Sequence, residues 1–117
     1  MKINSFLEQY LATALWSSID ENDDPFDDNY SIDDFSEEAL KQADKDCGLF
    51  IKKAGDLLDG FDDTDIAHDF WLTRNGHGAG FWDGDYPDDI GDKLTEIADE
   101  FRELHIYVAD DGKLYFE

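Results

Sequence analysis

Apolar residues recur along this chain at two spacings, one typical of helices and one typical of strands. In the segments 3–15, 40–58 and 90–101 they lie three and four positions apart, which predicts three helices that each have one apolar face. Ser36 is a favourable N-cap for the second helix. Residues 66–74 change to a strand-like run, and the dipeptide Asn75-Gly76 that follows is the one that a type I′ hairpin turn requires.

Two hairpins are predicted to form the sheet. The first joins a strand at 66–74 to a strand at 78–83, and the second joins 104–109 to 113–116 through Asp111-Gly112. The predicted order is ααββαββ, an α+β two-layer domain in which an antiparallel four-stranded sheet, made of the two hairpins, packs with three helices. The 117 residues fit a single domain over 1–117, because domains usually have about 100–150 residues.

The charge of the chain changes this ordinary picture. Thirty-one Asp and Glu residues against nine Lys and Arg residues give a net charge of −22 at pH 7. DNA, RNA and anionic membranes would repel such a surface, because nucleic-acid binding depends on contacts between phosphates and Lys or Arg. The sequence therefore excludes direct binding to nucleic acid or to membranes, and it predicts a partner that is basic.

Neither a membrane span nor a secretion signal is expected from the sequence. No window of about 20 residues is free of charge, and the N-terminus lacks a basic region followed by an apolar run. The single cysteine, Cys47, cannot form an internal disulfide. We therefore expect a soluble cytoplasmic protein whose stability comes from packing.

The densest acidic stretch is the connecting segment 20–38, which has ten acids in 19 residues and no base. Phe26, Tyr30, Ile32 and Phe35 interrupt the charge at short intervals. This pattern predicts a partly ordered segment whose apolar side chains hold it to the domain while its carboxylates face water. Asp outnumbers Glu by 23 to 8 in the whole chain, and short side chains suit a fixed array of charges because they lose little rotamer entropy.

Groups that could support catalysis or metal binding are few. His68, His77 and Asp83 are weak candidates for a metal-binding or acid–base site. The predicted hairpin register places His68 beside Asp83 but His77 at the opposite end of the hairpin. The glycine run 76–80 lacks the spacing and the following helix of a phosphate-binding loop, and no EF-hand spacing is present. Cys47 lies on the apolar face of a helix, which favours a buried thiol. We predict no catalytic residue, no metal and no cofactor.

The stretch 68–83, HDFWLTRNGHGAGFWD, resembles a block found in small acidic proteins of bacteriophages and other mobile elements. The resemblance continues through 90–95 and 106–113, while the first half of the chain is similar only in having an aromatic helix, an acidic stretch and a second helix. That family has no established activity, so the resemblance supplies no catalytic residue. It implies a setting in phage or plasmid biology, and hence the cytoplasm of a host cell.

These features together predict a nucleic-acid mimic of the anti-restriction or anti-CRISPR type, which blocks a basic nucleic-acid-binding host protein stoichiometrically by filling its Lys and Arg cleft. Two alternatives stay open: a ligand-binding, metal-binding or enzymatic module at His68, His77 and Asp83, and an adaptor for a basic protein, with acidity that reflects solubility or halophilic adaptation. The oligomeric state also stays open, including a homodimer that would lengthen the charge array. The predicted partner-binding residues lie in the connecting segment and near the second helix: Asp20, Glu21, Asp23, Asp24, Phe26, Asp27, Asp28, Tyr30, Asp33, Asp34, Asp62, Asp63 and Asp65.

Overall fold

The computed structural model describes residues 3–20, 22–76, 80–81 and 86–117. This part of the chain is mostly helical, with one small antiparallel sheet. The elements in chain order are α1 (Ser5–Ser17), α2 (Phe26–Asn29), the 3₁₀ helix η1 (Ile32–Asp34), α3 (Glu37–Ala54), the 3₁₀ helix η2 (Gly55–Leu58), α4 (Asp63–Arg74), α5 (Asp88–Asp99), β1 (Ile106–Val108) and β2 (Leu114–Phe116).

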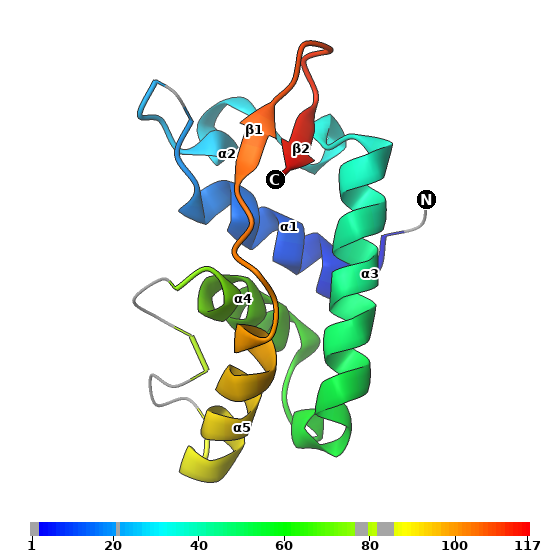
Figure 1. The fold of residues 1–117 in the computed structure, drawn as a ribbon, viewed down its shortest axis with the longest axis vertical. Helices are drawn as coiled ribbons and strands as arrows, with labels where there is room; N and C mark the ends of the chain where they lie inside the picture. The colour runs from blue at the N-terminus through cyan, green and yellow to red at the C-terminus, as the bar shows by residue number, and fades with distance from the viewer. Residues whose placement is uncertain (1–2, 21, 77–79, 82–85) are drawn as a thin grey trace.

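Helix α1 lies at the centre of the molecule (Figure 1). It packs most extensively on α4 and also contacts α2, η1 and α3. The hairpin β1–β2 and α2 lie at one end of the molecule, α5 lies at the other, and α3 extends along one side (Figure 1). The connecting segment 20–38 and the C-terminal hairpin are therefore neighbours in space, although they are far apart in the sequence.

The three helices predicted from apolar spacing are present as α1, α3 and α5. Helix α1 begins after Asn4, whose Oδ1 accepts a hydrogen bond from the Leu7 amide at 2.8 Å. Helix α3 begins after the predicted cap Ser36, whose Oγ accepts from the Ala39 amide at 3.0 Å. Each side chain satisfies one of the amides that the first turn of a helix leaves without a partner.

The C-terminal hairpin is also confirmed. Strands β1 and β2 pair antiparallel, with Tyr107 opposite Tyr115 at the centre of the register. The turn contains Gly112 at φ 80°, a conformation that glycine adopts without the strain of a side chain. Phe35 forms an isolated bridge to Leu114, which attaches the end of the connecting segment to the hairpin.

The predicted four-stranded sheet is wrong, because residues 66–74 belong to helix α4. The buried residues include Ile66, Ala67, Phe70 and Trp71. They occupy positions i, i+1, i+4 and i+5, which lie on one face of a helix. Asp63 and Asp65 in the first turn also favour a helix, since negative charge is stabilising near a helix N-terminus. Packing against α1 therefore outweighed the β-forming character of the aromatic run.

The dipeptide Asn75-Gly76 ends α4, so the predicted hairpin turn is wrong as well. Asn75 Nδ2 donates to the carbonyl of Trp71 at 3.0 Å, and Gly76 has φ 67°, as a residue just beyond a helix end often does. Of the predicted strand 78–83, only residues 80 and 81 lie among the described residues, and they form a bend and a turn. Over the described residues the fold is thus mainly helical, with a two-stranded sheet.

One buried ion pair joins the helices. Arg74 Nη1 donates to Asp46 Oδ2 at 2.8 Å and to the Tyr10 hydroxyl at 2.9 Å. Its Nε and Nη2 donate to the carbonyl of Arg102 at 2.9 and 2.6 Å, and its guanidinium lies 5.2 Å from the centre of the Phe101 ring. Arg74 therefore ties together α1, α3, α4 and the chain that follows α5.

Candidate functional site

The acidic connecting segment folds as an ordered cap over one end of the domain (Figure 1). Ile19 bridges Pro25, and the Phe26 amide donates to the carbonyl of Ser18 at 3.0 Å, which closes a tight loop between α1 and α2. Phe26 is 3% exposed and Phe35 is 4% exposed. The prediction that apolar side chains hold this segment to the domain is confirmed.

Most carboxylates of this segment face solvent, as the sequence predicted. Those at 23, 24, 27, 28 and 33 belong to exposed residues, and none of them forms a hydrogen bond or an ion pair with another described residue. Glu21, also predicted to bind the partner, lies outside the described residues. Of the predicted partner-binding residues of this segment, the carboxylates without a hydrogen bond or an ion pair to another described residue are therefore those of Asp23, Asp24, Asp27, Asp28 and Asp33.

Two other predicted residues of the segment have structural contacts. Asp20 Oδ1 accepts from the amides of Asn22 and Asp24 at 2.8 and 3.1 Å, which shapes the loop before α2. Asp34 Oδ2 accepts from the Ser31 amide at 2.7 Å and completes a capping box at η1. These two carboxylates hold the backbone that carries the exposed ones.

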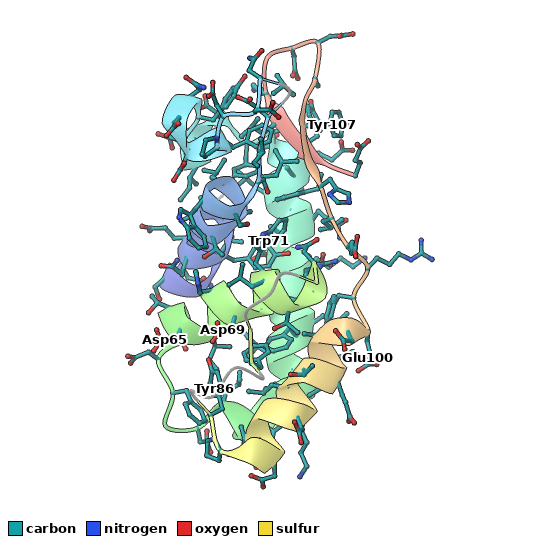
Figure 2. The ribbon with its side chains drawn as sticks, turned by 90° about the vertical axis from the view of Figure 1, so that its left-hand side faces the viewer. Asp65, Asp69, Trp71, Tyr86, Glu100 and Tyr107 are labelled. Atoms are coloured by element: carbon teal, nitrogen blue, oxygen red, sulfur yellow. The ribbon has the colours of Figure 1, made fainter. Side chains whose placement is uncertain are left out.

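The second predicted group of acids lies in a different part of the molecule. Asp62, Asp63 and Asp65 are exposed at the beginning of α4. Helix α1 packs against α4 and also against α2, so it lies between this group and the connecting segment. Figure 2 shows Asp65 well away from Tyr107, which lies on β1 near the connecting segment. The structure therefore presents two separate acidic regions.

The large apolar residues exposed at the surface differ from those that the sequence indicated. Phe26 is buried and lies 5.7 Å from the half-buried ring of Tyr30, so it anchors the segment and is not free to contact a partner. Trp16 is 58% exposed and Ile19 is 65% exposed, and sequence reasoning assigned neither to the surface. A signal was present for Trp16, because it follows Gln9 and Ala12 along α1, outside the apolar face.

The alternative site at His68, His77 and Asp83 does not have the predicted geometry. His68 belongs to helix α4, where its Nδ1 shares a hydrogen bond of 2.8 Å with Thr13 Oγ1 and its ring lies 5.6 Å from that of Trp16. A strand register that would place it opposite Asp83 therefore does not exist. His77 and Asp83 lie outside the described residues.

A hollow of about 400 Å³ lies beside this part of α4. It is lined by Phe61, Asp65, His68, Asp69 and Tyr86, and the Tyr86 hydroxyl donates to Asp69 Oδ2 at 2.6 Å. In Figure 2, Asp65, Asp69 and Tyr86 lie on the same side of the molecule. Within the part of the chain that the structure describes, no group of three His, Cys, Asp or Glu side chains is arranged to hold a metal ion.

Cys47 is buried in the core on α3, as its position on the apolar face predicted. Burial, with the neighbouring Asp46 as a second cause, raises the pKa of the thiol well above its ordinary value. We expect Cys47 in the native protein not to react with a thiol reagent such as DTNB at pH 8, because the thiolate is the reactive form. Full reaction should follow addition of denaturant. A rapid stoichiometric reaction without denaturant would contradict this description of the site.

Comparisons with known proteins add no assignment. A scan against protein-family models, a search of curated proteins and a search of solved structures each found no match. The resemblance of residues 68–83 to acidic phage proteins therefore stays a prediction. Among the described residues, no helix is both long enough and apolar enough to cross a membrane.

Proposed function

We propose that this protein binds a basic, nucleic-acid-binding protein by presenting carboxylates at positions where that protein otherwise holds phosphates. Binding blocks the cleft stoichiometrically, and no enzymatic reaction is part of the proposal. The resemblance at 68–83 suggests the setting, a bacteriophage or mobile element whose target is a host defence protein.

The observation that carries the proposal is the density of negative charge along the molecule. A net charge of −22 over a long axis of 43 Å is about one charge per 2 Å, compared with about one per 1.7 Å of duplex axis. The other two dimensions, 29 and 21 Å, make the molecule elongated. A cleft that binds a short length of duplex would therefore meet a similar charge over a similar length.

Few basic groups compensate this charge locally. Between described residues, only three acidic side chains lie within 4.0 Å of a basic one, and Asp46 of the buried pair is among them. The exposed pair Lys53–Glu100 contributes little, since surface ion pairs are worth about 0–1 kcal/mol. Four of the nine Lys and Arg residues lie together on α3: Lys41, Lys45, Lys52 and Lys53. The rest of the surface is therefore more negative still.

The fold holds the charges of the connecting segment in fixed positions. Asp27 and Asp28 lie on α2, directly after the buried anchor Phe26, and Asp33 lies on η1 before the buried anchor Phe35. A charge array attached to an ordered backbone loses little conformational entropy when it binds. Long-range attraction would speed the encounter with a basic cleft, while apolar contacts would set the rate of dissociation.

The proposal predicts that capture of the partner depends strongly on salt. The immobilised protein would be exposed to a nuclease-treated bacterial lysate and washed with salt that rises from about 50 to 200 mM, the range over which charge-driven binding weakens steeply. We expect basic nucleic-acid-binding proteins to be retained at low salt and released as the salt rises. Capture that does not change over this range would contradict the electrostatic account.

A further inference from the structure

Strand β1 has one edge with no partner strand among the described residues. At its other edge, His105 and Glu117 donate to each other's carbonyls at 3.0 and 2.9 Å, and the Ala109 amide donates across the hairpin at 3.0 Å. In an antiparallel ladder, residues that form such bonds alternate with residues whose N–H and C=O groups point the other way. The backbone groups of Ile106 and Val108 therefore point away from β2.

A groove of about 270 Å³ lies beside β1. All three residues of β1 line it, and the other lining residues are Ile19 and members of the connecting segment, including Asp20, Phe26 and Tyr30. Ile19 is 65% exposed and Tyr107 of β1 is 39% exposed, so part of this apolar surface is in contact with solvent. Figure 2 shows Tyr107 at the surface of this end of the molecule.

An unpaired strand edge beside an apolar groove is suited to an extended chain. A peptide that adds to a sheet edge gains backbone hydrogen bonds, and pockets for its alternate side chains give specificity. The exposed side chain of Ile19 and the half-buried side chain of Tyr30 line the groove and would receive the apolar side chains of such a peptide. The free N–H and C=O groups of Ile106 and Val108 would bond its backbone.

The charge around the groove determines what kind of chain would bind. One wall belongs to the segment that has ten acids in 19 residues and no base. Asp20 lines the groove itself, and Asp110 and Asp111 lie exposed at the hairpin turn next to β1. A strand that alternates apolar and basic residues would match both features, because successive side chains of a strand point to opposite sides.

We propose that β1 binds an extended basic segment of the partner protein as an additional strand. This inference rests on the proposed function, from which it takes the positive charge of the partner. It adds where the partner binds, at the edge of β1, and how it binds, as an added strand. Strand β1 has three residues, about 10 Å of backbone, so the added strand supplies a few hydrogen bonds while the surrounding carboxylates supply long-range attraction.

The test uses a variant that changes only the outward edge of β1. In Val108→Pro the proline lacks the N–H that would bond the added strand, and edge strands tolerate proline where the N–H is not part of the ladder. Val108→Thr is the matched control, because it keeps the N–H and the branched shape. The probe is a short, capped peptide of alternating lysine and valine, and a glutamate–valine peptide serves as the charge control.

Binding is measured by NMR titration, together with hydrogen exchange of the Ile106 and Val108 amides. We expect both amides to exchange rapidly in the free protein and at least tenfold more slowly with the lysine peptide, whereas the glutamate peptide has no effect. Val108→Pro should weaken binding of the lysine peptide at least fivefold while the Val108→Thr control binds normally.

Two results would overturn the inference. One is unchanged exchange of both amides when the peptide is saturating, and the other is equal affinity of Val108→Pro and wild type. Either result would leave the proposed function standing if binding of the lysine peptide still weakens as the salt concentration rises. The peptide would then be held by charge alone. Loss of that salt dependence would instead count against the proposed function. Circular dichroism of both Val108 variants verifies that they are folded.

Discussion

Replacing Arg74 with methionine is expected to lower the free energy of unfolding by about 3–5 kcal/mol. Methionine fills much of the volume of the side chain, but it leaves the Asp46 carboxylate buried without the charge that compensates it. The change also removes the donors to the Tyr10 hydroxyl and to the carbonyl of Arg102. Urea denaturation followed by tryptophan fluorescence measures the effect.

Arg102→Met is the matched control for this prediction. The side chain of Arg102 is exposed, and its backbone carbonyl, the group that Arg74 contacts, is unchanged by the substitution. Its effect should stay within about 0.5 kcal/mol, as for ordinary surface positions. The double variant Arg74→Met with Asp46→Leu should recover part of the loss, because the unpaired charge is gone. Equal stabilities of Arg74→Met and the Arg102→Met control would contradict this role for the ion pair.

Changing Asp23, Asp24, Asp27 and Asp28 together to asparagine is expected to weaken binding to the basic partner by roughly 10- to 100-fold. This corresponds to four contacts of about 0.3–0.7 kcal/mol each, within the range measured for exposed charge pairs. Folding should not suffer, since none of these carboxylates forms a hydrogen bond or an ion pair with another described residue. Asp23 has φ 65°, a conformation that asparagine also tolerates.

A second set of four substitutions tests whether binding depends on the connecting segment or on the total charge of the protein. Changing Asp59, Asp62, Asp63 and Asp65 to asparagine removes the same amount of charge from the region before and at the start of α4. If the connecting segment is the binding surface, this control should weaken binding less than threefold. Isothermal titration with the captured partner measures the affinity of both variants. Equal losses in the two variants would show that total charge matters and that the connecting segment is not a specific site.

Helices with one clear apolar face could be predicted from the sequence. The apolar residues of α1, α3 and α5 recur at spacings of three and four, and the N-cap Ser36 of α3 can be identified from the sequence. The hairpin β1–β2 was also predictable, because Asp111-Gly112 lies between two short apolar runs. In these elements, local propensity and tertiary packing favour the same structure.

The segment 66–74 shows why the rest of the fold could not be predicted in the same way. The segment carries two signals: Ile66, Phe70 and Trp71 are β-forming residues, while the buried positions 66, 67, 70 and 71 have helical spacing. Packing on α1, which lies far away in the sequence, decided between them. Asn75-Gly76 is similarly ambiguous, since a glycine with positive φ serves a helix end as well as a hairpin turn.

For the candidate site, the sequence indicated where the charge lies but not which side chains are free. The pattern of acids and aromatics in 20–38 predicted correctly that most of the segment's carboxylates face solvent, but it did not show that Asp20 and Asp34 hold the backbone. It did not show that Phe26 is too deeply buried to contact a partner or that Ile19 is exposed, because both depend on how the loop before α2 closes. Nor did it show that Asp65 lies in a separate acidic region, since that follows from the position of α1.

The most direct test of nucleic-acid mimicry is a competition titration with the purified partner. Labelled protein would be bound to the partner, and unlabelled duplex DNA would be added at constant salt. Mimicry predicts that DNA displaces the protein completely, and that the apparent Kd for the protein rises linearly with the DNA concentration. A complex that holds the partner, the protein and DNA together, with an unchanged Kd, would contradict mimicry and favour an adaptor that binds elsewhere on the partner.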